Sequence, residues 1–383
     1  MNKILKMISI LMLATVITGC GGSGGVGATQ STGENGAGAT QFAGGNGATG
    51  EDRLQVVTTI FPIYDWARQV VGAASKDVDV MLLVENGVDM HSFQPTASDL
   101  MTIADCDLFL YVGGESDEWV EEALMTAANP DRVTLKLIDV LGDAALEEEI
   151  AEGMEHDHDE HDHKHDKQSA DTTLSDDVRT GEASQKSEHP VSEANTGMGA
   201  PIIERQLDEH VWLSLKNAQV LTKAIAESLA NVNPSNADMY FENQAAYAKK
   251  LAALDAEYEE VIKNAQRDTL LFGDRFPFRY LLNDYGVSYY AAFPGCSSET
   301  EASFETVRFL ANKTKELELN CVLTIEGSDN RIAQTIIDSA DRTDCKTLTL
   351  DSMQSVTKDD IENGVTYLSV MEENLEVLKE ALQ

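Results

Sequence analysis

The sequence predicts an α/β protein of two lobes, each with a four-stranded, mainly parallel sheet flanked by helices, joined by one long rigid helix. Three observations support this prediction. Short apolar runs alternate with helical segments, which is typical of parallel strands linked by crossover helices. This alternation occurs twice along the chain. Between its two occurrences a helical pattern continues for about thirty residues without Gly or Pro.

The first half of the folded chain, residues 54–233, contains four short runs with the composition of buried strands. We expect strands at 55–60, 78–83, 107–112 and 133–138, and a helix around 64–71. The second half, residues 267–383, repeats this pattern. There we expect strands at 269–272, 287–290, 321–325 and 347–350, and a last helix at 359–382. Each half therefore supplies enough strands for one sheet.

The segment 234–266 carries the helical pattern that separates the two halves. Pro234 and Ser235 are typical of a helix start, and Ser235 is the expected N-cap. Apolar and aromatic residues recur at helical spacings, at Tyr240, Tyr247, Leu251, Leu254, Tyr258 and Ile262. We interpret the segment as a rigid connector between two lobes. Two shorter helices with a break between them are the alternative.

The N-terminus has the features of a secretory leader. Two lysines precede an apolar run at 7–17, which is too short for an ordinary membrane span. The small residues directly before Cys20 resemble the lipobox of bacterial lipoproteins, in which the cysteine is lipidated; an ordinary signal peptide is the alternative. We therefore expect a lipoprotein signal peptide at 1–20 and a flexible Gly-rich tether at 21–53. These features predict an extracytoplasmic protein, lipid-anchored to a bacterial cell membrane.

The formal net charge of −38 limits the possible partners. Binding to phosphate backbones requires basic patches, so nucleic acid is excluded, and docking on an anionic membrane surface is disfavoured. No stretch after the leader is long and apolar enough to span a bilayer, so attachment would depend on the lipid. We expect a monomer of two domains.

The periodic patterns fail between residues 146 and 204, which we interpret as a disordered insertion in the first lobe. Five histidines alternate there with acidic residues: His156, His158, His161, His163 and His165. This composition favours weak, multivalent metal capture. The alternative is a polar loop that has no function.

Two other histidines stand alone in sequence with globular character. His91 lies in ENGVDMHSFQPTASDL at 85–100, and His210 lies in DEHVWLSLKNA at 208–218. Each is in a short polar turn beside an apolar run. Imidazole is a ligand for zinc, copper, iron and nickel, whereas carboxylates suit harder ions such as manganese. The pattern indicates a protein that binds a divalent metal.

The two motifs resemble the metal-ligand motifs of the zinc and manganese solute-binding proteins of ABC transporters, known as cluster A-I. The His-rich insertion, the lipobox and the long central helix are also similar, and the resemblance covers nearly all of residues 54–383. It implies a metal site between two lobes, with His91 and His210 as ligands from the first lobe. It also implies delivery of the ion to an ABC permease for import. Open α/β sheets bind ligands in crevices at the carboxyl ends of their strands, which agrees with this placement.

The second lobe departs from the pattern of the zinc members, which usually have a third histidine after its first strand. This chain has FGDRFP at 272–277, and the resemblance implies Asp274 as the replacement. A fourth ligand is implied in IEGSDNR at 325–331, where Asp329 matches the carboxylate of manganese members and Glu326 is the neighbouring alternative. Loop caps or salt bridges are the other possible roles of these acids. Two imidazoles and two carboxylates suit zinc or manganese; the His-rich insertion favours zinc.

No catalytic motif accompanies these ligands. The sequence lacks His-Glu-x-x-His and a P-loop, and a closed four-ligand site leaves no coordination position for a substrate. We expect no enzyme activity; a secreted metalloenzyme and a surface adhesin are less favoured alternatives.

The remaining cysteines allow one prediction. Cys321 and Cys345 precede successive strands of the second lobe, at the same end if those strands are parallel. Outside the cytoplasm we expect them to form a disulfide. Cys106 and Cys296 lie in different lobes and are less suited to pairing.

Overall fold

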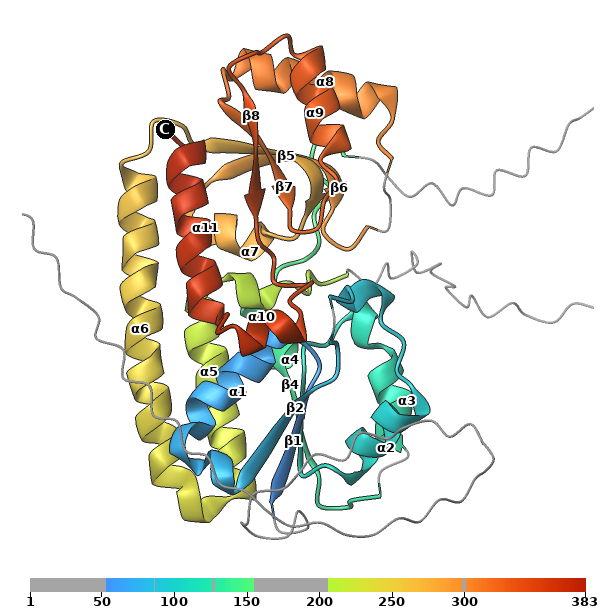
Figure 1. The fold of residues 1–383 in the computed structure, drawn as a ribbon, viewed down its shortest axis with the longest axis vertical. Coiled ribbons are helices and arrows are strands. Elements are labelled where there is room, and N and C mark those ends of the chain that lie inside the picture. The colour runs from blue at the N-terminus through green and yellow to red at the C-terminus, as the bar shows by residue number, and fades with distance from the viewer. Residues whose placement is uncertain (1–52, 86, 126–127, 155–205, 298–300) are drawn as a thin grey trace, which may run out of the picture. The chain divides into compact units, whose positions relative to one another are not determined.

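The computed structural model of the chain describes residues 53–85, 87–125, 128–154, 206–297 and 301–383. Four predicted features lie outside these described residues: the signal peptide, the lipidation of Cys20, the tether before residue 53 and metal capture by the histidines of the 156–165 tract. The chain forms two sheets of four parallel strands, each flanked by helices, and a long helix runs between them (Figure 1). This confirms the predicted fold class.

The first sheet has the strand order β2-β1-β3-β4. Its strands are β1 (Leu54–Thr58), β2 (Val78–Leu82), β3 (Leu108–Tyr111) and β4 (Val133–Lys136). The helices of this lobe are α1 (Phe61–Val71), α2 (Ala97–Asp105), α3 (Trp119–Met125), α4 (Leu137–Leu141) and α5 (Leu215–Val232). Successive residues of a strand point to opposite faces of the sheet, so a strand that is apolar throughout has apolar side chains on both faces. Helices cover both of these faces. Val56 packs in the core that includes Trp66 of α1, whereas Val57 packs with Ile103 of α2 and Val120 of α3.

The second sheet has the order β6-β5-β7-β8. Its strands are β5 (Thr269–Phe276), β6 (Ser288–Pro294), β7 (Cys321–Ile325) and β8 (Lys346–Leu350). Its helices are α7 (Arg279–Tyr285), α8 (Phe304–Glu316), α9 (Arg331–Ser339), α10 (Lys358–Glu362) and α11 (Tyr367–Ala381). Leu271 packs with Leu310 of α8 and Ile336 of α9, while Leu270 faces the core shared with α11. Both faces are again covered.

The long helix α6 (Ala237–Lys263) is continuous over 27 residues, as the helical pattern predicted. It buries one side, which includes Tyr240, Tyr247 and Tyr258, against α5, α1 and α11. The predicted N-cap at Ser235 is wrong. Pro234–Asn236 form a short 3-10 helix, and the Ser235 hydroxyl donates to the Asn233 side chain instead.

The predicted C-terminal helix is two helices. Asn363, Gly364, Val365 and Thr366 separate α10 from α11, and Gly364 has a φ of +95°, which ends the first helix. A capping box at Thr366 and Ser369 then starts α11. The ring of Tyr367 packs edge-on against Trp66 at 5.0 Å, and its hydroxyl donates to the Trp212 carbonyl at 2.7 Å. The start of α11 therefore contacts the first lobe through Tyr367.

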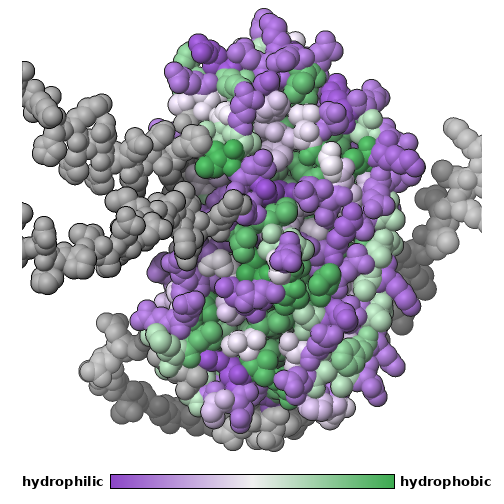
Figure 2. Space-filling view, turned by 180° about the vertical axis from the view of Figure 1, so that it is seen from behind, coloured by the Kyte–Doolittle hydropathy of each residue, from purple (hydrophilic) through white to green (hydrophobic). Residues whose placement is uncertain are grey.

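Short 3-10 helices fill several connections: η1 (Gly72–Lys76), η2 (Met90–Ser92), η3 (Glu115–Asp117), η4 (Gly142–Ala144) and η5 (Val211–Leu213), besides η6 (Pro234–Asn236). Two of them, η2 and η5, adjoin the lone histidines. In the part of the chain that the structure describes, no helix has the length and apolar character needed to cross a membrane. The face opposite to that of Figure 1 mixes hydrophilic side chains with hydrophobic ones over its middle (Figure 2).

The segment around the His-rich tract begins and ends as part of the first lobe. The Glu148 N–H donates to the Gln206 carbonyl, and the Asp208 N–H donates to the Leu146 carbonyl, each at 2.8 Å. Met154 is buried, so the insertion starts later than residue 146, where the sequence pattern placed its beginning. The two flanks therefore meet two residues before His210.

Candidate metal centre

His91 is positioned by the connection that follows the carboxyl end of β2. It lies in the 3-10 helix η2, whose N-cap is Asp89. One oxygen of Asp89 accepts a hydrogen bond from the His91 N–H at 3.0 Å, and the other pairs with Arg275 of the second lobe at 2.6 Å. Burial alone would raise the pKa of Asp89, but the Arg275 guanidinium and His91 hold it below its usual range. The acid therefore stays charged and fixes the histidine loop.

His210 is fully buried at the start of the turn that leads into α5. Oδ1 of Asp208 accepts from both the backbone N–H of His210, at 2.9 Å, and its Nδ1, at 3.1 Å. The Tyr280 hydroxyl from the second lobe donates to the Asp208 carbonyl at 2.9 Å. These contacts fix the orientation of the ring and direct its Nε2 away from Asp208.

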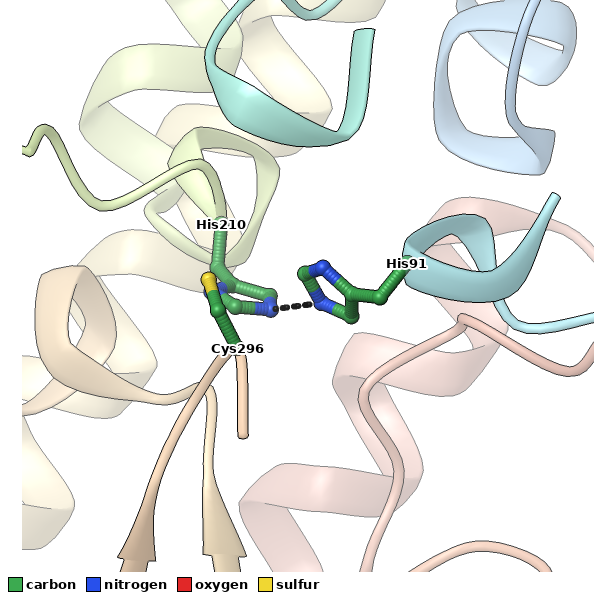
Figure 3. A group of neighbouring side chains, drawn as sticks. All are labelled: His91, His210 and Cys296. Atoms are coloured by element: carbon green, nitrogen blue, oxygen red, sulfur yellow. Dashed lines mark hydrogen bonds between the residues drawn. The ribbon is translucent and has the colours of Figure 1, made fainter. Parts of the chain in front are cut away.

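The two rings meet tip to tip. Nε2 of His91 lies 3.2 Å from Nε2 of His210, with ring centroids 5.3 Å apart (Figure 3). Two nitrogens bound to one tetrahedral zinc at about 2.05 Å are about 3.3 Å apart. The observed separation fits this distance, and it also fits a hydrogen bond between the two rings in the absence of an ion. The two motifs converge as expected, and the role of His91 and His210 as metal ligands stays a prediction.

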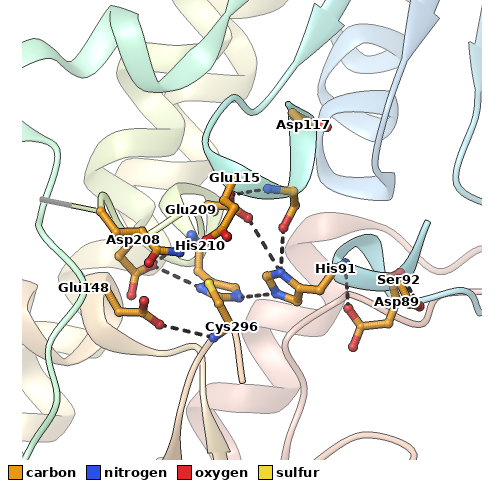
Figure 4. A network of polar contacts seen from close by, with 12 residues as sticks. Asp89, His91, Ser92, Glu115, Asp117, Glu148, Asp208, Glu209, His210 and Cys296 are labelled. Carbon is orange, nitrogen blue, oxygen red and sulfur yellow. Dashed lines mark hydrogen bonds and ion pairs between the residues drawn. The ribbon is translucent and has the colours of Figure 1, made fainter. Parts of the chain in front are cut away.

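The Nδ1 atom of His91 is also held by polar groups (Figure 4). It lies 2.7 Å from the Ser116 hydroxyl and 3.6 Å from Oε2 of Glu209. Glu209 is fully buried, and its Oε1 accepts from the Ser116 N–H at 2.7 Å. A Cβ at Gly114, which has a φ of +97°, would lie 2.4 Å from that oxygen, so this turn requires glycine. A buried carboxylate beside each histidine favours a cation between the rings.

The electrostatics of His91 suit metal binding. Burial, followed by the charge that His210 would carry, lowers the pKa of His91 to about 3. The ring is therefore neutral near pH 7, which is the form that coordinates a metal. Burial raises the pKa of Glu209, although its hydrogen bonds with Ser116 act in the opposite direction.

A third candidate ligand comes from the second lobe and was missed by the sequence reasoning. Cys296 follows the carboxyl end of β6, and its sulfur and one nitrogen of each histidine all lie within 4.8 Å of one another (Figure 3). The Cys296 N–H donates to Glu148 at 3.4 Å. Burial, and then the carboxylates of Glu148 and Glu209, raise the pKa of the thiol. In the sequence, the feature that could have pointed to Cys296 is the Pro294-Gly295-Cys296 turn after a predicted strand.

The acids predicted from the second lobe line a cleft of about 640 Å³ that His91 also lines. Asp274 accepts from the Arg275 N–H at 2.9 Å, and Asp329, whose side chain is 61% exposed, pairs with Arg331. Both oxygens of Glu326 accept from Ser352 or Gln354. None of the three belongs to the group formed by the two histidines and Cys296. The assignment of Asp274 and Asp329 as ligands stays a prediction.

The four cysteines among the described residues are free thiols. Cys321 begins β7 and Cys345 directly precedes the parallel neighbour β8, so they lie at the same sheet end as predicted. Their disulfide stays a prediction.

A model of the family described as "Zinc-uptake complex component A periplasmic" matches residues 56–381. Among curated relatives, the zinc-binding lipoprotein AdcA of Streptococcus pneumoniae serotype 4 is 30% identical over 334 residues, which are 86% of this chain and 56% of that protein. The high-affinity zinc uptake system protein ZnuA of Bacillus subtilis is 27% identical over 332 residues, 86% of this chain and 88% of that protein. This chain thus spans about half the length of the streptococcal relatives and most of the Bacillus one.

Solved structures show the same architecture. The Zn(II)-bound ZnuA-like domain of Streptococcus pneumoniae AdcA aligns with a TM-score of 0.60 at 25% identity, covering 86% of this chain and 99% of that one. The metal-dependent lipoprotein YcdH of Bacillus subtilis aligns with a TM-score of 0.62 at 24% identity, covering 86% and 100%. The second likeness concerns the fold alone.

Proposed function

The chain belongs to the zinc-uptake complex component A family, and we propose that it captures a zinc ion between its two lobes and delivers it to the permease of an ABC importer. The observation that carries the proposal is the 3.2 Å approach of the His91 and His210 Nε2 atoms, each ring being held at its Nδ1 side by buried polar groups. Both rings are fixed before the ion arrives, which reduces the ordering cost of binding.

The proposed site takes the ion as cargo. His91 and His210 hold it from the first lobe, and the acids that line the cleft, Asp274 and Asp329, are the proposed carboxylate contacts from the second. Asp208 and Glu209 offset the charge of the dication. We expect no hydrolase activity from this arrangement. The proposed place of action is outside the cytoplasmic membrane, with the monomer anchored through a lipid on Cys20.

Manganese is the second candidate. Hard oxygen ligands suit manganese, and two carboxylates in the cleft beside His91 favour it. The similarity to a zinc-binding lipoprotein and to a zinc uptake protein favours zinc, as does the His-rich tract at 156–165.

The test is metal binding by the protein from residue 21 onward. Elemental analysis of protein purified without added metal, followed by competition between zinc and manganese against a chromophoric chelator, identifies the cargo. His91→Ala and His210→Ala should each weaken zinc binding on the order of 100-fold or more, since each removes a ligand. Lys223→Ala, an exposed change in α5 paired only with Glu227 in the described structure, is the control. Zinc affinity unchanged in both histidine variants rules out the shared site.

A further inference from the structure

We propose that Cys296 supplies a thiolate ligand to the ion held by His91 and His210, and that this thiolate makes the site prefer zinc and other thiophilic dications over manganese. The inference rests on the proposed function and assigns the chemistry of its selectivity. On binding, the Sγ–H bond breaks, the proton passes to water, and the sulfur forms a bond to the ion, so one proton is released for each ion.

The geometry of the three atoms leads to this assignment. In a four-coordinate zinc site with bonds of about 2.05 Å to nitrogen and 2.3 Å to sulfur, nitrogen and sulfur lie about 3.6 Å apart. The Cys296 sulfur is already within 4.8 Å of a nitrogen of each histidine. A side-chain movement on the order of 1 Å completes the arrangement, which is within the reach of a rotamer adjustment.

The loop that carries Cys296 is built to approach His210 closely. A Cβ at Gly295 would lie 3.0 Å from Cε1 of His210 and 2.9 Å from the Phe276 carbonyl, so a side chain at residue 295 would push the loop away from the ring. Glu148, from the flank of the insertion, accepts the Cys296 N–H at 3.4 Å. The loop that carries the thiol therefore lies close to the buried histidine and is held there by a hydrogen bond to Glu148 of the first lobe (Figure 4).

The ligand type decides the selectivity. Thiolates bind zinc strongly, whereas manganese prefers carboxylate and water oxygens. Two imidazoles and one thiolate form a nitrogen and sulfur set that a carboxylate from the cleft can complete to four ligands. A half-buried cysteine that merely fills space would leave the metal preference unchanged, so the preference separates the two roles.

The experiment uses Co²⁺ as the probe on the protein from residue 21 onward, under reducing conditions. A bound thiolate gives an intense near-ultraviolet sulfur-to-cobalt charge-transfer band, whereas nitrogen and oxygen ligands do not. We expect this band in the wild type and in Cys345→Ser, a thiol variant away from the histidines. We expect its loss in Cys296→Ser, with a fall in the zinc-to-manganese affinity ratio on the order of tenfold or more. Cys296→His should restore zinc preference without the band.

The outcomes keep the two proposals apart. Cobalt bound by the wild type without the band overturns the thiolate assignment and leaves the proposed function intact. Failure of the wild type to bind zinc or cobalt at all removes the proposed function and, with it, this inference. Should Cys296→Ser fail to fold, Gly295→Ala keeps the sulfur but displaces its loop, and a band of unchanged intensity in that variant counts against the geometry.

Discussion

Substitution of Asp208 tests most directly whether this aspartate orients the ring of His210 for metal binding. One of its oxygens accepts two hydrogen bonds from the same residue, at the backbone N–H and at Nδ1 of His210. Its side chain is 4% exposed, so water does not substitute for it. Asp208→Asn retains an oxygen acceptor but removes the negative charge, and Asp208→Ala removes both. The pair of variants therefore separates the electrostatic contribution from the orienting one.

The expected magnitudes follow from the behaviour of groups that hydrogen-bond to metal ligands. Loss of such a partner typically weakens metal binding by about 10- to 100-fold. We expect Asp208→Asn at the lower end, about 10-fold or ~1.4 kcal/mol, because the ring keeps its hydrogen bond. We expect Asp208→Ala at the upper end, about 100-fold or ~2.7 kcal/mol, because His210 is then free to rotate away from His91.

The assay is zinc competition against a chelator, with the melting temperature of the metal-free protein measured in parallel. Asp284→Asn is the matched control: that aspartate is half-buried and accepts from the Ser214 hydroxyl at 2.6 Å. It should change stability without changing zinc affinity. Equal affinities for the wild type and Asp208→Ala would refute the argument that the carboxylate prepares the ring.

Three further outcomes are expected. Deleting residues 156–165 should remove weak additional zinc binding while leaving one tight site, as counted by equilibrium dialysis, because the site's histidines lie outside that tract; loss of the tight site would contradict this. Non-reducing mass spectrometry of protein secreted from cells should show Cys321 linked to Cys345, adding about 3 kcal/mol of stability under the chain-entropy model; another pairing would be inconsistent with the strand order. Burial raises the pKa of Asp117 to about 6 from 3.8. Between about pH 4 and 6 the folded state then binds more protons than the unfolded state, so the contribution of Asp117 to stability falls as pH rises through that window. Asp117→Asn should flatten the pH dependence of the free energy of unfolding, measured with urea, by at most about 3 kcal/mol. An unchanged pH profile would exclude this role of Asp117.

The fold was predictable because its strands are buried on both faces. Runs such as 108–112 are apolar at successive positions, since helices cover both sides of each sheet, and such runs stand out in the sequence. All eight predicted strands are present. The errors lie at ends: β5 continues to Phe276 and β6 to Pro294, both beyond their predicted last residues. Gly273, Asp274 and Arg275 are not apolar, so the sequence pattern ended β5 too early.

Those strand ends explain which site residues were predicted and which were missed. His91 and His210 stand in short motifs whose chemistry is visible without a structure. Cys296 does not, because its proximity to His210 depends on how far β6 extends and on the absence of a side chain at Gly295. The Pro294-Gly295-Cys296 turn is visible in the sequence, but which side chain it approaches depends on how far β6 extends, and local residue spacing does not encode that.

The order of strands in the second sheet places the end of β6, which precedes Cys296, beside the end of β5, where the third ligand was expected. β5 is the neighbour of β6, so the carboxyl ends of these parallel strands lie about 4.8 Å apart along the same sheet edge. Within β5, a Cβ on Gly273 would lie 2.6 Å from the Ala333 Cα, which leaves no space for a side chain there. Arg275, two residues after Gly273, forms an ion pair with Asp89 of the first lobe. On the thiolate proposal, the soft ligand of the second lobe is Cys296 after β6, while the ion pair between Arg275, near the end of β5, and Asp89 holds the His91 loop against the second lobe.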